Sequence, residues 1–209
     1  MMHNTCLRFR VAILGACLLA CTGCARSKPA RFYLLSAMTK PSDVKPAFPG
    51  ASEITIGVGP VELPPYVDRP QIVTRSGSNR LHLAEYDRWA EPLKQGMARV
   101  LAGNLSTAVG TDHIVLFPWK ASETPDYQIV VVVTRFDSTS AGTAVLTARW
   151  SILGKGEQQK RLTRQSAIRR DAESKSYEAV VAAESWAVAK LSEEIATAIV
   201  AMSRAGPTP

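Results

Sequence analysis

Cysteine is missing from nearly the whole chain. All four cysteines lie within the first 24 residues, and the other 185 residues (209 − 24) contain none. A disulfide framework would place cysteines inside the folded domain, so the sequence excludes a small disulfide-stapled protein. Histidine is scarce too: after residue 24 only His82 and His113 occur, and they share no metal-ligand spacing with acids or cysteines. The sequence therefore predicts neither a metal site nor a cofactor.

Signatures of catalysis and of nucleic-acid binding are also lacking. The chain has no G-x-S-x-G elbow, no Walker loop and no S-x-x-K box with its partner motifs. Gly57 and Gly59 do not form a dinucleotide loop, because prolines rather than a helix follow them. The net charge is +7, but no basic stripe alternates with aromatic residues as in nucleic-acid-binding proteins. We therefore expect a protein that is not an enzyme and does not bind nucleic acid.

No apolar run is long enough to cross a membrane as a helix. The run at residues 11–20 is about half as long as the roughly 20 apolar residues that a span requires. It follows a head that contains Arg8 and Arg10 and no acid, and small residues come after it. This is the pattern of a secretory signal peptide, which we assign to residues 1–20. Its removal leaves 23 basic and 18 acidic residues, a net charge of +5 that would suit anionic lipid headgroups or an acidic partner.

The cysteines indicate which kind of signal peptide this is. A bacterial lipoprotein signal ends in a short box of apolar and small residues before a cysteine that is acylated on its thiol. The letters L-L-A-C at 18–21 fit this box well, whereas C-T-G-C at 21–24 fits less well because a cysteine stands where leucine is expected. We therefore predict a palmitate-type anchor at Cys21, with Cys24 as the alternative. Neither cysteine is followed by the Asp that commonly retains a lipoprotein in the inner membrane, which favours the outer membrane. Several acyl chains, at about 0.8 kcal/mol per buried CH₂, give stable anchoring.

The rest of the chain alternates between strand-like and helix-like periodicity. We expect an acylated tether over 21–30, a single domain over 31–203 and a tail over 204–209. Period-two patterns and turn residues predict strands, and apolar residues at helical spacing predict two helices. The fold class expected is α+β, an antiparallel or mixed sheet with the two main helices packed on one face. The predicted strands are 31–36, 53–61, 71–75, 80–86, 113–119, 126–136, 143–153 and 158–169, and the predicted helices are 90–108 and 174–202.

Three local expectations depend on these patterns. Trp89 continues the apolar stripe of the first helix, and Asp87 stands where a capping residue would start it. The nearly continuous apolar run of 126–136 predicts a central strand that is buried on both faces. Glu184 is compatible with the wetter side of the second helix, together with the other acids of that region.

The segment from 63 to 93 combines a proline-rich bend, a hairpin signal and the start of a helix. Its many charges form either a charged active cluster or, as we favour, ion pairs that fix the segment to the body. The four tryptophans of the chain either line a lipid groove or, as we favour, pack within the core. We take six residues of this segment as a candidate assembly or structural motif: Tyr66, Asp68, Arg69, Pro70, Arg75 and Trp89.

Several motifs of the chain, in the same order, resemble the PqiC-like family of ABC-type transport auxiliary lipoproteins, formerly a domain of unknown function. The resemblance covers almost the whole of the expected mature domain. In that family the acylated cysteine usually lies a few residues before the first strand, so Cys24 would give the more typical gap. The motifs are R-F-Y-L-L-S, L-P-P-Y-V-D-R-P-Q-I-V-T-R, L-H-L-A-E-Y-D-R-W-A-E-P-L, D-Y-Q-I-V-V-V-V-T-R-F-D and L-T-A-R-W-S-I.

The resemblance implies a lipoprotein of the outer membrane that faces the periplasm. Its implied partners are MCE-domain proteins and ABC-type machinery that move lipids or other hydrophobic molecules between two membranes, and it implies a homo-oligomer. Two other functions remain open from the residues alone. One is a lipid-binding carrier, which needs a sizeable apolar cavity, and the other is a cell-envelope hydrolase, which needs a converging nucleophile and base.

Overall fold

The computed structural model describes residues 28–37, 47–120, 123–155 and 161–204. Both candidate acylation sites, Cys21 and Cys24, lie outside the described residues, as does the predicted signal peptide. The elements are β1 (Arg31–Tyr33), the short 3-10 helix η1 (Ala51–Glu53), β2 (Ile56–Glu62), β3 (Gln71–Arg75), β4 (Leu81–Trp89), α2 (Leu93–Val109), β5 (Ile114–Leu116), β6 (Tyr127–Thr139), β7 (Thr143–Gly154), β8 (Arg161–Asp171) and α3 (Tyr177–Arg204).

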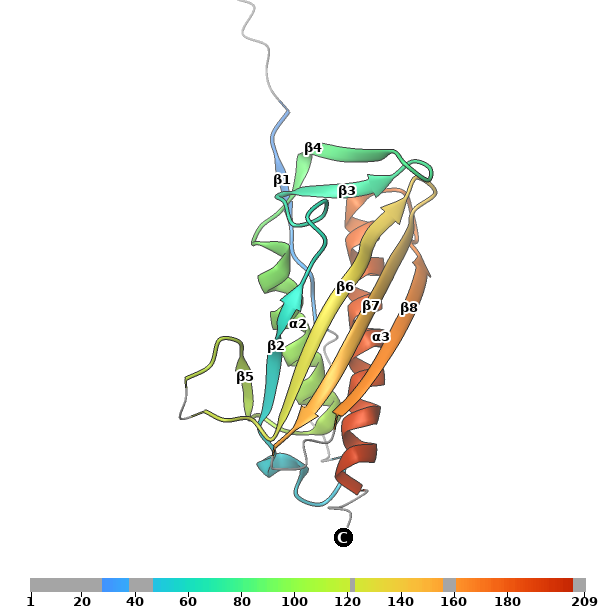
Figure 1. Ribbon diagram of the computed structural model, residues 1–209. Coiled ribbons are helices and arrows are strands. Elements are labelled where there is room, and N and C mark those ends of the chain that lie inside the picture. Colours follow the sequence, from blue (N-terminus) through green and yellow to red (C-terminus); the bar gives the residue numbers. More distant parts are fainter. Residues whose placement is uncertain (1–27, 38–46, 121–122, 156–160, 205–209) are drawn as a thin grey trace, which may run out of the picture.

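The strands of the described residues form one mixed sheet. Its order is β1-β4-β3-β6-β2-β5, and β7 and then β8 extend it from the other edge of β6. The pairs β3–β4, β6–β7 and β7–β8 are antiparallel, whereas β1–β4, β2–β5, β2–β6 and β3–β6 are parallel. Two helices complete the fold behind the sheet (Figure 1). The expected α+β class, with a mixed sheet and two helices, is therefore confirmed.

The core lies between the helices and one face of the sheet. In β6 the side chains of Ile129, Val131 and Val133 are buried, while Val130 and Val132 between them are only half-buried. The expectation of a strand buried on both faces was therefore wrong. The physical reason is that the described helices cover one face of the sheet (Figure 1). Buried and half-buried side chains therefore alternate along β6, although its sequence is continuously apolar.

The helix α3 covers β6, β7 and β8, and α2 lies beside it against β2. Apolar residues at helical spacing on both helices are fully buried, among them Met97 and Leu101 of α2 and Leu191 and Ile195 of α3. None of the described helices is both long enough and apolar enough to cross a membrane. The stripe of each helix is therefore used to close a protein core.

The start of α2 differs from the expectation. Asp87 and Trp89 belong to β4, and the helix begins only at Leu93 with Pro92 at its cap position. The reason is the parallel pairing of β4 with β1, in which Trp89 lies beside Tyr33. This pairing extends the strand beyond the predicted residue 86, and the Asp87 carboxylate is used inside the sheet instead of at a helix end.

Candidate functional site

The connection between β2 and β3 is folded into tight turns. The backbone N–H groups of Val67 and Asp68 both donate to the carbonyl oxygen of Pro64, at 3.1 and 3.3 Å. At the end of the connection, the carbonyl oxygen of Pro70 accepts a 2.7 Å hydrogen bond from the N–H of Trp89 in β4. Because each proline also fixes its own φ angle, the connection is held to one path across the end of the sheet.

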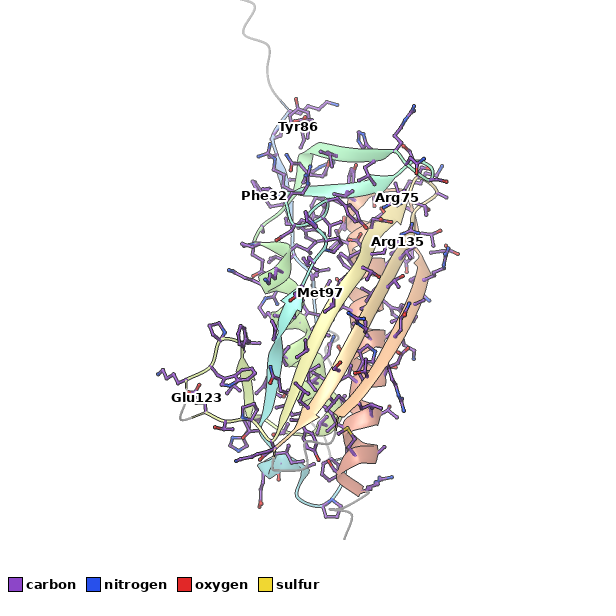
Figure 2. The ribbon with its side chains drawn as sticks, viewed as in Figure 1. Phe32, Arg75, Tyr86, Met97, Glu123 and Arg135 are labelled. Atoms are coloured by element: carbon purple, nitrogen blue, oxygen red, sulfur yellow. The ribbon has the colours of Figure 1, made fainter. Side chains whose placement is uncertain are left out.

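Asp137 is the centre of a buried ion cluster beneath this connection. Its side chain is fully inaccessible, and one carboxylate oxygen accepts from the Tyr66 hydroxyl at 2.9 Å and from Arg75 Nε and Nη2 at 3.1 and 3.0 Å. The other oxygen accepts a hydrogen bond from Arg135 Nε at 2.9 Å, and Arg135 Nη2 lies 2.9 Å from it in an ion pair. Figure 2 shows both arginines at the same end of the sheet. Such charge-assisted bonds tie the segment to β6.

The cluster also fixes the protonation of its members. Burial raises the pKa of the Tyr66 hydroxyl, and the neighbouring negative charge of Asp137 raises it further. The hydrogen bond to Asp137 raises the pKa of the Arg75 guanidinium, whose central carbon lies 5.5 Å from the centre of the Tyr66 ring. Tyr66 is therefore a neutral hydrogen-bond donor and Arg75 a permanent cation at neutral pH.

Glu184 of α3 is the second deeply buried acid. Its side chain is 2% exposed, and Oε2 has no hydrogen-bond partner among the described residues. Burial raises the pKa of Glu184 to about 8, and the negative charge of Asp137 adds to this effect. The expectation that Glu184 lies on the wet side of the helix was therefore wrong, because the position falls on the stripe that faces the sheet.

A surface pocket of about 350 Å³ lies on the outer side of the same segment. Trp89 and Leu93 give it an apolar floor, and both side chains are buried. Arg69 contributes a buried Nε that has no hydrogen-bond partner among the described residues. Its lining comes from the β2–β3 connection and from the β4–α2 junction: Asp68, Arg69, Pro70, Trp89, Ala90, Glu91, Pro92 and Leu93.

An ion pair closes one side of this pocket. Arg99 of α2 contacts the Glu91 carboxylate through Nε at 3.1 Å, and its Nη2 also donates to the carbonyl oxygen of Leu35 at 3.0 Å. Gly96 leaves room for this arrangement, since a Cβ there would come within 2.9 Å of the Glu91 carboxylate. The Glu91 charge is therefore paired with Arg99 of α2 at a partly exposed position.

A third acid ties the short strand β1 to the sheet. Asp87 accepts from Arg31 Nε and Nη2 at 2.7 and 3.0 Å and from the Tyr33 hydroxyl at 2.8 Å. Burial acts to raise the pKa of Asp87, but the bonds from Arg31 and Tyr33 outweigh it and hold that pKa below its ordinary value. These contacts stabilise the point at which the chain enters the described domain.

The structure divides the six candidate residues between two places. Tyr66 and Arg75 meet at Asp137, underneath the segment. The other four, Asp68, Arg69, Pro70 and Trp89, line the pocket on its outer side. The 63–93 segment therefore has an inner side that forms ion pairs with β6 and an outer side that is partly apolar.

Sequence reasoning missed the partners of these residues. Arg135 and Asp137 are two positions apart in β6, so they share a face of the strand, and this spacing is the signal that could have pointed to their ion pair. Glu184 falls in the apolar stripe between Val181 and Val188, which could have indicated burial. The pairing of Asp137 with Tyr66 and Arg75 joins residues more than 60 positions apart and left no local signal.

The described part of the chain brings together ion pairs and offers no cluster of metal ligands. No group of three or more His, Cys, Asp or Glu side chains within it could hold a metal ion. His82 and His113 are both exposed, on β4 and just before β5. The described site thus combines an apolar pocket with charged residues of both signs.

Comparison with known proteins agrees with the fold. The family model described as "ABC-type transport auxiliary lipoprotein component" matches residues 33–196.

Solved structures of similar fold are also known. A crystal structure of an uncharacterised protein is 21% identical, with a TM-score of 0.67, and the match covers 82% of this chain and 99% of that protein's chain. Protein XCC0632 from Xanthomonas campestris is also 21% identical at a TM-score of 0.67, over 84% of this chain and 99% of its own. The PelC dodecamer from Paraburkholderia phytofirmans is 13% identical over 66% of this chain and 85% of its own, and its TM-score of 0.39 is too low to support an inference. No curated protein matches the chain.

Proposed function

Because the chain belongs to the family of ABC-type transport auxiliary lipoprotein components, we propose that it is a non-enzymatic, lipid-anchored subunit of an intermembrane transport system. Acylated Cys21, or alternatively Cys24, anchors it in the outer membrane, and its single domain over 31–203 faces the periplasm. Its partners are an MCE-domain protein and ABC-type machinery that move lipids or other hydrophobic molecules. It also associates with further copies of itself.

The observation that supports an assembly role is the division of the 63–93 segment into two sides. Its inner side is fixed to β6 through Asp137, so the outer side is held in one geometry before any partner arrives. Rigid, pre-organised surfaces lose little conformational entropy on binding. A segment built in this way suits docking better than it suits a flexible lid over a reaction centre.

The pocket on the outer side indicates what kind of partner group fits. Trp89 and Leu93 would contact an apolar side chain, and buried aromatic floors of this kind are typical of binding hot spots. The guanidinium of Arg69, a residue that lines the pocket, would donate to a carbonyl or carboxylate oxygen of the same partner segment. We therefore assign the docking role to Asp68, Arg69, Pro70 and Trp89 as a pocket.

The two alternative functions find less support in the described residues. A carrier needs an enclosed apolar cavity, but the space between the helices and the sheet is filled by a continuous cluster of buried side chains. A hydrolase needs a nucleophile beside a base, but Asp87, Glu91 and Asp137 are each held by an arginine. Both observations favour an auxiliary subunit.

Affinity purification of the full chain from detergent-solubilised envelopes, followed by mass spectrometry, tests the proposal. We expect an MCE-domain protein or an ABC-type component to be recovered with the unsubstituted protein. We expect Arg69→Ala to reduce that recovery strongly, since it removes the guanidinium from the lining of the pocket. Recovery without any MCE or ABC component would contradict the proposed partnership.

Two further variants make this experiment specific. Arg80→Ala, at the exposed tip of the β3–β4 hairpin, removes a positive charge outside the pocket and should leave recovery unchanged. Asp68→Ala changes the rim of the pocket without touching its floor and should weaken recovery. If folded, acylated Asp68→Ala and Trp89→Ala proteins still complement a deletion strain, the pocket is not the docking site.

A further inference from the structure

Large exposed hydrophobic side chains are concentrated at two separate places in the described domain. Leu116 and Phe117 lie on β5 and directly after it. The others lie on or beside the pair β1 and β4, where Phe32 is 64% exposed, Leu34 48% and Tyr86 43%. Figure 2 shows Phe32 and Tyr86 at the end of the molecule that carries β1 and β4, far from β5.

The register of β1 and β4 explains why one face of this pair is apolar and exposed. Phe32 lies beside Arg88, and Tyr33 lies beside Trp89. Because side chains alternate along a strand, Tyr33 and Trp89 point into the domain, while Phe32 and Arg88 share the opposite face. Tyr86 lies two residues before Arg88, where the register of β4 with β3 shifts, and it is also exposed. The outward face of β1 and β4, which we define by Phe32, Leu34, Tyr86 and Arg88, is thus built into the strand pairing.

A shallow groove of about 620 Å³ extends this apolar surface onto α3. Phe32 and Leu34 form one wall, and Val181 and Trp186 of α3 contribute to the other. The guanidinium carbon of Arg170 lies 5.0 Å from the centre of the Trp186 ring. The surface therefore combines aromatic and aliphatic side chains with a cation at its edge.

The predicted acylation site lies close to this face along the chain. Lys28, the first described residue, is four residues after Cys24 and seven after Cys21. At no more than about 3.6 Å per residue, these tethers reach about 14 Å and about 25 Å. Phe32 follows Lys28 by four residues, so the acyl chains and the outward face cannot be far apart.

From this placement we propose that the outward face of β1 and β4 lies in the interfacial region of the membrane that holds the acyl chains. The inference rests on the anchor proposed above. Aromatic side chains such as Phe32 and Tyr86 are favoured at the boundary between hydrocarbon and headgroups. Two acids border the surface, Glu85 on β4 and Glu178 in the groove.

The cations around this face suit anionic headgroups. Lys28 and Arg170 are exposed, and Arg88 is half-buried with its Nε bonded to the carbonyl oxygen of Glu85 at 3.1 Å. Basic groups next to an anionic membrane are attracted to its headgroups, while their aliphatic stems remain along the apolar surface. A lipid surface is therefore a better occupant of this face than a second hydrophobic protein patch.

Two matched tryptophan reporters test the proposal. Leu34→Trp places a new tryptophan on the outward face, and Leu116→Trp places one on β5 at nearly the same exposure, 48% against 45%. The full chain, purified in its acylated form as verified by mass spectrometry, is reconstituted into vesicles of phosphatidylethanolamine and phosphatidylglycerol. Lipids brominated near the headgroup end of the acyl chains then quench tryptophans that enter the interface, and the emission of the unsubstituted protein is subtracted.

We expect the added emission of Leu34→Trp to be mostly lost and that of Leu116→Trp to be retained. Equal loss at both positions, or no loss at Leu34→Trp in an acylated protein, would overturn the proposed face and leave the anchor intact. Quenching that depends on the ratio of protein to lipid would assign the face to contact between copies and would also overturn it. A protein without an acyl group would remove the premise and overturn both proposals. Phe32→Trp repeats the measurement if Leu34→Trp lowers the melting temperature.

A second measurement separates this surface from the docking pocket. The double substitution Phe32→Ser and Tyr86→Ser should abolish membrane contact of the face, seen as loss of the Leu34→Trp quenching. It should leave recovery of the transport partners unchanged, because the pocket at Arg69 is untouched. Loss of the partners with quenching retained would assign the outward face to protein docking and would overturn the membrane assignment.

Discussion

Two buried carboxylates, one at the end of β6 and one within α3, are held in opposite ways. Asp137 accepts hydrogen bonds from a tyrosine and from two arginines. Glu184 has an oxygen without a partner among the described residues, and its raised pKa keeps it protonated at neutral pH. Both carboxylates are almost fully inaccessible, so burial alone does not set the protonation state of an acid. The hydrogen-bond donors around the carboxylate set it.

The largest effect on stability is expected when Asp137, the acid with more hydrogen-bond donors, is replaced. Asp137→Asn takes away the shared anion and leaves the charges of Arg75 and Arg135 close together. Breaking a buried ion cluster in this way should lower the free energy of unfolding by about 3 kcal/mol. Chemical denaturation measures it. Asp112→Asn, at an exposed position, is the control, and an equally small change in both variants would mean that the cluster contributes little stability.

Replacement of the second acid, Glu184, should change the stability in the opposite direction. The folded-state pKa of Glu184, about 8, exceeds its ordinary value of 4.5, so its contribution to stability is complete below about pH 4.5 and is lost as the pH rises towards 8. Glu184→Gln removes this loss and should stabilise the protein by about 2–3 kcal/mol near pH 7. The melting temperatures of both proteins, measured between pH 4 and pH 9, check this expected stabilisation.

The same helix offers a matched control for this pH dependence. Glu193→Gln changes an exposed acid that is paired with Lys190 and should not give the stabilisation near pH 7 that Glu184→Gln gives. In the Asp137→Asn background the pKa of Glu184 should fall, because a neighbouring negative charge is gone. An unchanged pH profile in Glu184→Gln would contradict the assignment of the titration to this residue.

A smaller effect is expected at Tyr66, which supplies one of the donors to Asp137. Tyr66→Phe removes a hydrogen bond to a carboxylate that keeps its two arginines, and should cost about 1–2 kcal/mol of stability. Tyr86→Phe removes a hydroxyl from an exposed ring and serves as the control. A loss at Tyr66 no greater than at Tyr86 would show that the hydroxyl does not tie the segment to β6.

The smallest effect is expected at Arg31, which is largely exposed. Arg31→Ala should lower the melting temperature slightly at neutral pH and raise the pKa of Asp87 towards its ordinary value. Because the pKa of Asp87 is lowered in the folded protein, the stabilisation exists above the ordinary pKa and is lost as the pH falls through the folded one. The two proteins should therefore converge in acid, and a constant difference in a pH series would contradict this.

Local patterns predicted the antiparallel part of the sheet well. The β3–β4 and β6–β7 hairpins were expected because turn residues separate two alternating runs, and both pairs form. The open edge was expected at 158–169 from its charges, and among the described strands β8 pairs with β7 alone. These features depend on residues close together in the sequence, which is why a single sequence was sufficient for them.

Features that join distant residues could not be predicted in the same way. The parallel pairing of β1 with β4 extends a strand through Asp87 and Trp89, although Trp89 stands at helical spacing from Leu93 and Met97. Likewise, Asp68, Arg69, Pro70 and Trp89 were selected as one motif, but the pocket they line arises only when the β2–β3 connection meets the β4–α2 junction. Tertiary contacts therefore overrode local periodicity at the site.

The three-residue strand β1 has a mechanical consequence. It is the first described element after the proposed tether, and it runs parallel to β4. At its start Asp87 holds Arg31 and Tyr33, and we call these contacts the Asp87 clamp. Tension on the lipid anchor would therefore be directed along β1 and would load its hydrogen bonds and the clamp together in shear, instead of opening them one after another. A short strand can in this way resist force better than its length suggests, and the domain would stay folded while a transport partner pulls on it.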